Sequence, residues 1–127
     1  MPALPLPLAV LPLGDELYGV DAKGGLVAVT GLNNTLLVVD VATPSTPWLV
    51  GTLAGGSGFD VKLEGDHALV AAGAEGVYAV DLSAPASPAV DGWYDSSGLA
   101  MKLAHDGAVV YAATGGAGHW ALRCDTC

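Results

Sequence analysis

The feature that most constrains this chain is an internal repeat with a period of about 41 residues. The segment Asp40–Pro47 (DVATPSTP) returns as Asp81–Pro88 (DLSAPASP), and Gly51 returns as Gly92. A fixed period of this size is typical of an array in which one supersecondary unit is repeated. The repeat therefore predicts an architecture, and by itself it indicates neither a reaction nor a ligand.

Each repeat unit divides into four segments of strand length, separated by glycine- and aspartate-containing turns. Residues 59–63 alternate apolar and polar side chains, which is the period of a half-buried strand. Residues 36–40 and 77–81 are almost continuously apolar, which indicates burial on both faces. The Pro-x-x-Pro link cannot be a central strand because proline lacks a backbone donor, so the segment after it suits an outer edge strand. Four short antiparallel strands in about 40 residues are typical of a β-propeller blade, and the predicted fold is all-β and propeller-like.

The segments Leu36–Val41 and Val77–Leu82, each with its downstream Pro-x-x-Pro link, resemble the LVIVD repeat. The resemblance spans residues 17–123. It implies a β-propeller-like protein of a bacterial and archaeal family that is often associated with the cell surface, and it transfers no known site. The third copy departs from the pattern, with Arg123 in place of the repeated aspartate and Cys127 in place of the first proline of the link.

We expect a single repeat domain with a donated outer strand and three blades, the last of them incomplete. The expected boundaries are residues 1–16 for the strand and residues 17–56, 57–96 and 97–127 for the blades. Residues 7–13 fit the register of the fourth strand at residues 47–53, and the chain ends where a third link should begin. Because closed propellers typically need four to eight blades, two interpretations stay open. The chain is a fragment of a larger propeller, or two copies join head-to-tail into a six-bladed ring in which residues 8–13 complete the other copy's third blade.

Charge and composition narrow the class of partner. Four Lys or Arg against 13 Asp or Glu give a net charge of −9, which disfavours nucleic acid because phosphate binding needs basic patches. The apolar residues 1–13 contain four prolines and no basic flank, so we expect neither a signal peptide nor a membrane-spanning helix there. The family resemblance, rather than the composition, suggests an exported or cell-surface protein whose signal would lie upstream.

Aspartate and cysteine residues supply the candidate metal ligands. Asp40 and Asp81 recur after a buried strand and could bind calcium, which takes oxygen ligands, but a repeated aspartate more often accepts hydrogen bonds from the turn that follows. Cys124 and Cys127 form a CxxC that could be half a zinc site, a redox pair or a disulfide. Without a second CxxC in the sequence we favour a structural or incidental role for them. Asp60 is expected to be solvated, and no cofactor is predicted, with calcium and zinc as weaker alternatives.

Histidine and aromatic residues are the remaining functional candidates. His67 and His105 fall on or beside hairpin turns and are expected to be solvated, whereas for His119 exposed and partner-bound roles both stay open. Trp93 and Tyr94, on an outer strand, are the best candidates for a partner surface. The sequence contains no nucleophile elbow, P-loop or dinucleotide fingerprint. We therefore expect a non-catalytic scaffold for a protein or glycan partner; the alternative is a channel-centred hydrolase or lyase site that uses carboxylates and a metal.

Overall fold

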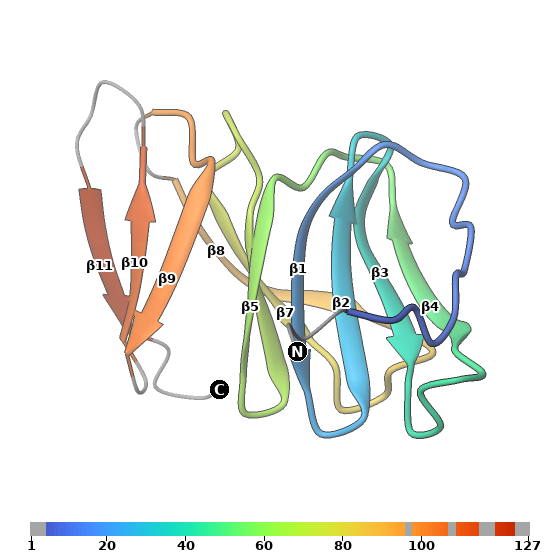
Figure 1. Ribbon diagram of the computed structural model, residues 1–127. Coiled ribbons are helices and arrows are strands. Elements are labelled where there is room, and N and C mark those ends of the chain that lie inside the picture. The colour runs from blue at the N-terminus through green and yellow to red at the C-terminus, as the bar shows by residue number, and fades with distance from the viewer. Residues whose placement is uncertain (1–4, 96–97, 107–108, 115–118, 124–127) are drawn as a thin grey trace.

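The computed structural model is all-β and describes residues 5–95, 98–106, 109–114 and 119–123. In these residues eleven strands form three antiparallel sheets of four, four and three strands, which fan out side by side (Figure 1). The described residues contain no helix, and therefore none long and apolar enough to cross a membrane. The predicted propeller-like architecture is confirmed, because each sheet corresponds to one copy of the repeat.

The three sheets are called blades 1, 2 and 3 in chain order. Blade 1 contains β1 (Leu17–Lys23), β2 (Leu26–Gly31), β3 (Asn34–Asp40) and β4 (Trp48–Ala54). Blade 2 contains β5 (Asp60–Glu64), β6 (His67–Ala71), β7 (Val77–Asp81) and β8 (Ala89–Tyr94). Blade 3 contains β9 (Lys102–Asp106), β10 (Val109–Ala113) and β11 (His119–Arg123).

Within each blade the strands pair in chain order, so that β4 and β8 are edge strands, as the proline links predict. Blades 1 and 2 share their register. Leu26 pairs with Asp40 in blade 1, and His67 pairs with Asp81 at the equivalent place in blade 2. Both blades also contain a β-bulge between the third and fourth strands. The repeat in the sequence is thus a repeat of backbone geometry.

Apolar side chains fill both junctions between neighbouring blades. One cluster lies between blades 1 and 2 and includes the buried residues Ala28, Leu36, Val38, Val61, Val70 and Val80. A second lies between blades 2 and 3 and includes Leu69, Ala71, Val77, Leu103, Val110 and Ala112. Blade 2 therefore packs on both faces, as expected for the middle unit of a stacked array.

Residues 5–16 precede β1 and contain no strand. Leu6, Leu8 and Val10 are 79%, 71% and 85% exposed, whereas Leu11 and Leu13 are half-buried. The segment that resembles a fourth strand therefore pairs with none of the three sheets of its own chain. Its donation to another copy stays a prediction.

Candidate functional site

Carboxylates on the first strands of blades 1 and 2 join each blade to the next. Asp21 on β1 accepts a hydrogen bond from the backbone N–H of Leu63 on β5, at 2.8 Å. Asp60 on β5 accepts one from the N–H of Leu103 on β9, also at 2.8 Å, and another from the N–H of Val61 at 2.9 Å. Asp60 is only 8% exposed, so the expectation that it is solvated was wrong. A buried carboxylate needs such partners, and the adjoining blade supplies one of them.

His105 also bridges two blades. It lies within β9, and its Nδ1 is 2.5 Å from a carboxylate oxygen of Glu64 on β5. The histidine is exposed, as the sequence predicts, although it belongs to a strand rather than to a turn. Like the bonds of Asp21 and Asp60, this contact joins the first strands of two adjacent blades, and it does not indicate a reaction centre.

The repeated aspartates form the same turn in blades 1 and 2. Asp40 accepts a hydrogen bond from the N–H of Ala42 at 2.9 Å, and Asp81 accepts one from the N–H of Ser83 at 2.8 Å. The turn hydrogen bonds expected from the sequence are therefore present, and each aspartate stabilises the start of the proline link. The backbone and side-chain hydrogen bonds from Ser83, together with the nearby His67, hold the pKa of Asp81 below its ordinary value.

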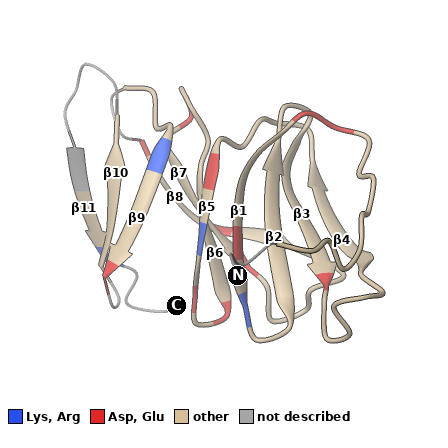
Figure 2. Ribbon diagram, viewed as in Figure 1, with Lys and Arg blue, Asp and Glu red and all other residues tan. Residues whose placement is uncertain are grey.

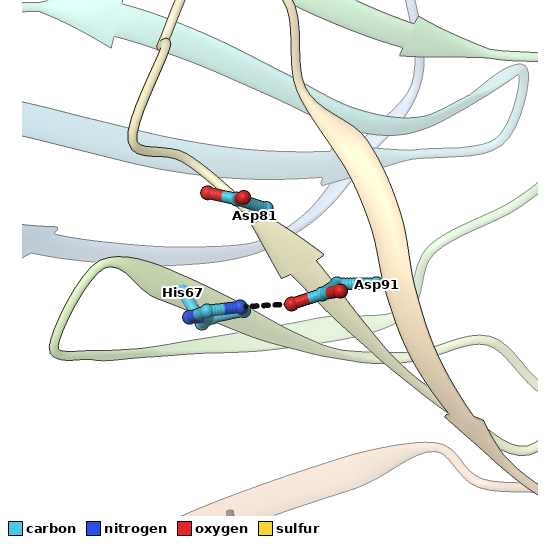
Figure 3. A group of neighbouring side chains, drawn as sticks. All are labelled: His67, Asp81 and Asp91. Carbon is cyan, nitrogen blue, oxygen red and sulfur yellow. Dashed lines mark hydrogen bonds and ion pairs between the residues drawn. The ribbon is translucent and has the colours of Figure 1, made fainter. Parts of the chain in front are cut away.

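His67 differs most from its predicted environment. It is the first residue of β6 and is 6% exposed, so its assignment to a solvated turn was wrong. The hairpin turn is shorter than the sequence suggests, because His67 already pairs with Glu64 on one side and with Asp81 on the other. Its Nε2 is 2.7 Å from a carboxylate oxygen of Asp91 (Figure 3).

Asp91 reaches His67 through the β-bulge of blade 2. Val80 pairs with Val90 and Ala79 pairs with Gly92, which leaves Asp91 as the extra residue on β8. A bulge re-aims the side chain that it carries. As a result one potential ligand atom from each of His67, Asp81 and Asp91 lies within 4.8 Å of the others, on three adjacent strands (Figure 3).

Sequence reasoning identified Asp81 but missed His67 and Asp91 as its neighbours. A usable signal was present in the repeat. The residues of blade 1 in the same register are Leu26, opposite Asp40, and Val50, the extra residue of its bulge. Two apolar side chains in one copy are thus replaced by a histidine and an aspartate in the next.

This cluster borders a partly open cavity in a protein of net negative charge. A cavity of about 240 Å³ lies between the hairpin turns of blades 1 and 2, with Lys23 and Leu26 on one side and His67 and Leu82 on the other. Figure 2 shows acidic residues in every blade, whereas the four Lys and Arg are spread over four different strands. A cation rather than an anion is the favoured ion on such a surface.

The predicted partner residues lie beside an apolar groove between blades 2 and 3. Trp93 is 62% exposed and Tyr94 is 37% exposed. The groove has a volume of about 210 Å³, and these two residues line it together with Leu69, Val77, Ala79, Gly92, Leu122 and Arg123.

Glu75 fixes the position of the indole of Trp93. The indole N–H donates a hydrogen bond to the backbone carbonyl of Glu75. The Glu75 carboxylate in turn accepts a hydrogen bond from the hydroxyl of Tyr78. That hydrogen bond, with partial burial and the charge of Glu75, raises the pKa of Tyr78 to about 12.

Three further sequence candidates lie wholly or in part outside the described residues. Cys124 and Cys127 lie outside the described residues, and His119 begins β11 without a described side chain. The roles considered for them stay predictions.

Comparison with known proteins returns one family. The family model described as LVIVD repeat matches residues 17–54 and 55–96, which correspond closely to blades 1 and 2. Neither the curated proteins nor the solved structures include a significant match to the chain.

Proposed function

This chain belongs to the LVIVD repeat family, and we propose that it is a non-catalytic β-propeller scaffold that binds a protein partner in the groove beside Trp93 and Tyr94. The observation that carries the proposal is an exposed tryptophan held against an apolar groove. Rigid aromatic side chains next to a pocket are the residue types that dominate binding energy at protein interfaces.

A protein partner fits the groove better than a glycan does. Most of the lining is contributed by leucine, valine, alanine and glycine. Sugar hydroxyls taken out of water need hydrogen-bonding partners, and a largely apolar lining supplies few of them. β8, which contributes Gly92, Trp93 and Tyr94 to the groove, is also an edge strand, the kind of strand to which an extended peptide can add.

The proposal is tested by selecting displayed peptides against the immobilised chain and screening the labelled chain on a glycan array. We expect peptides whose affinity falls at least about 10-fold with Trp93→Ala, because hot-spot residues contribute 2 kcal/mol or more, as an order of magnitude. Trp48→Ala is the matched control, since Trp48 is 56% exposed on the edge strand β4 and does not line the groove. Binding that ignores Trp93, or binding to glycans alone, would refute the proposal.

The alternative of a channel-centred hydrolase or lyase has less support. Its carboxylates would come from the first strands of the blades, where Asp21, Asp60 and Glu64 are bonded to the adjoining blade. These groups are engaged in holding the array together rather than in lining a free site.

We also propose that two copies close head-to-tail into a six-bladed ring. Exposed apolar side chains on residues 5–10, which pair with no sheet of their own chain, favour donation of this segment. Light scattering on the purified chain is the test, and a clean monomer in dilute buffer rules the ring out. An exported or cell-surface location, which rests on the family resemblance, is tested by fractionating the cells that produce the protein.

A further inference from the structure

We propose that His67, Asp81 and Asp91 form a zinc-binding site that ties together three strands of blade 2. The inference is independent of the partner groove, which lies between blades 2 and 3 and shares none of the three residues. It is carried by the geometry of the cluster, by the burial of the histidine and by the comparison with blade 1.

The three side chains converge from β6, β7 and β8, and their ligand atoms lie within 4.8 Å of one another. Zinc ligands at about 2.1 Å lie about 3.4 Å apart in a tetrahedron, so small rotations of the aspartate side chains close the site. Asp81 accepts backbone and side-chain hydrogen bonds from Ser83, and its two oxygens together offer about four lone-pair sites, so it can still bind an ion. Asp91 has a side chain that is 52% exposed, so water reaches the fourth position.

The imidazole of His67 presents one of its two ring nitrogens, Nε2, to this cluster. Its side chain is 8% exposed and is directed at Asp91 (Figure 3). Its Nδ1 is the one buried side-chain nitrogen or oxygen in the described part of the chain that has no hydrogen-bond partner. Nδ1 lies on the other side of the ring from Nε2, so an ion shared with the two carboxylates would bind Nε2, and the imidazole proton would then lie on Nδ1.

Blade 1 shows what the same place looks like without a site. Its equivalent residues are Leu26, Asp40 and Val50, in the same register and around the same bulge. The turn therefore needs only the aspartate, and apolar residues satisfy the packing. In blade 2 these two positions hold a buried histidine and an exposed aspartate, both of which are metal-ligating residue types beside the repeated aspartate.

The ligand set selects the metal. One imidazole nitrogen and two carboxylate oxygens suit zinc, whereas calcium takes six to eight oxygens and magnesium keeps most of its water. The charge of Zn²⁺ also cancels the repulsion between Asp81 and Asp91. The ligands come from β6, β7 and the edge strand β8, and the first strands β1, β5 and β9 contribute none. The site therefore joins strands within blade 2 and does not lie on a central channel.

The test is calorimetric titration of the whole, chelator-treated chain with Zn²⁺, with Cys124 and Cys127 replaced by serine in every sample so that the CxxC cannot contribute. We expect one zinc per chain and a higher thermal midpoint when zinc is bound. His67→Leu and Asp91→Val install the residues of blade 1 and are expected to fold and to weaken binding at least about 10-fold. Asp81→Asn should weaken binding, whereas its matched control Asp40→Asn removes the equivalent turn carboxylate and should leave binding unchanged.

Two further measurements do not depend on those variants folding. Imidazole nitrogen NMR signals of the parent chain should shift on zinc addition for His67 and not for His105 or His119. The double substitution Leu26→His with Val50→Asp should create a second zinc equivalent in blade 1. Absence of binding at 100-fold excess zinc, full affinity in folded His67→Leu, or a shift at His105 alone would overturn the proposal.

Discussion

Replacing Asp60 with alanine tests whether a buried carboxylate holds blades 2 and 3 together. The carboxylate accepts backbone N–H bonds from Leu103 in the adjoining blade and from Val61 in its own. Leu103 is 7% exposed, so its amide has little access to water once the acceptor is gone. The nearest cation, Lys62, is 4.0 Å away and half-buried, and it adds little.

The size of the effect follows from these contacts. A hydrogen bond to a charged group contributes roughly 1.5–3 kcal/mol, and a buried donor left without a partner costs about 1–3 kcal/mol. Removing a charge from the interior returns part of its desolvation cost. We therefore expect Asp60→Ala to lower the free energy of unfolding by about 3 kcal/mol, as an order of magnitude.

Urea denaturation followed by circular dichroism measures the loss, with the denaturant slope checked for two-state behaviour. Asp60→Asn keeps one acceptor oxygen and should lose about 1 kcal/mol, because a neutral hydrogen bond replaces a charged one. Asp66→Ala is the control, since Asp66 is an exposed turn residue and should change stability by under about 0.5 kcal/mol. A loss within that same margin for Asp60→Ala would refute the inter-blade role of the carboxylate.

Three further predictions concern the repeat and two titrating groups. Gly51→Ala should destabilise the fold by about 2 kcal/mol in urea denaturation, because a Cβ there would collide with the carbonyl of Pro85 in the proline link of blade 2. Gly92 is the equivalent residue of blade 2, and a Cβ there would meet only the Ala79 side chain at 3.6 Å, so Gly92→Ala should be tolerated. Hydrogen bonds from the neighbouring turn lower the pKa of Asp81 below its ordinary value of 3.8. The ionised carboxylate therefore stabilises the fold above pH 3.8, and this stabilisation is lost as the pH falls through the pKa of the folded state. Asp81→Asn should reduce the dependence of the unfolding free energy on pH in the acid range. Ultraviolet titration of the tyrosines should show Tyr78 ionising near pH 12, and Glu75→Gln should move it back toward 10.

The blades were predictable from the sequence because their signals are local and occur twice. The run from Leu36 to Asp40 reads as a strand buried on both faces, and its four apolar residues are all buried. The proline links predict edge strands, and β4 and β8 are edges. Because the same pattern occurs in two copies, the strand boundaries can be predicted by aligning the copies, which a single copy would not allow.

The candidate site could not be predicted in the same way. Asp91 meets His67 only because a bulge inserts one residue into β8, and nothing in the local sequence marks the bulge position. The burial of His67 depends on a turn shorter by one residue than the glycine–aspartate pattern suggests, and a shift of one residue exchanges the two faces of a strand. The contact of Asp60 with Leu103 is formed between blades, which sequence periodicity within one blade does not describe.

Differences between copies carry the information about function in this chain. Gly19 in blade 1 and Asp60 in blade 2 occupy the same place, each directly before a paired valine. A Cβ at Gly19 would lie 2.6 Å from the Cα of Asp60, so glycine is what lets blade 2 approach that closely, while the aspartate of blade 2 reaches on to blade 3. That departure from the repeat is explained by a neighbouring blade. The departures at His67 and Asp91 lie within blade 2, where the two side chains bond to each other at 2.7 Å, and the proposed zinc site adds Asp81 to that pair.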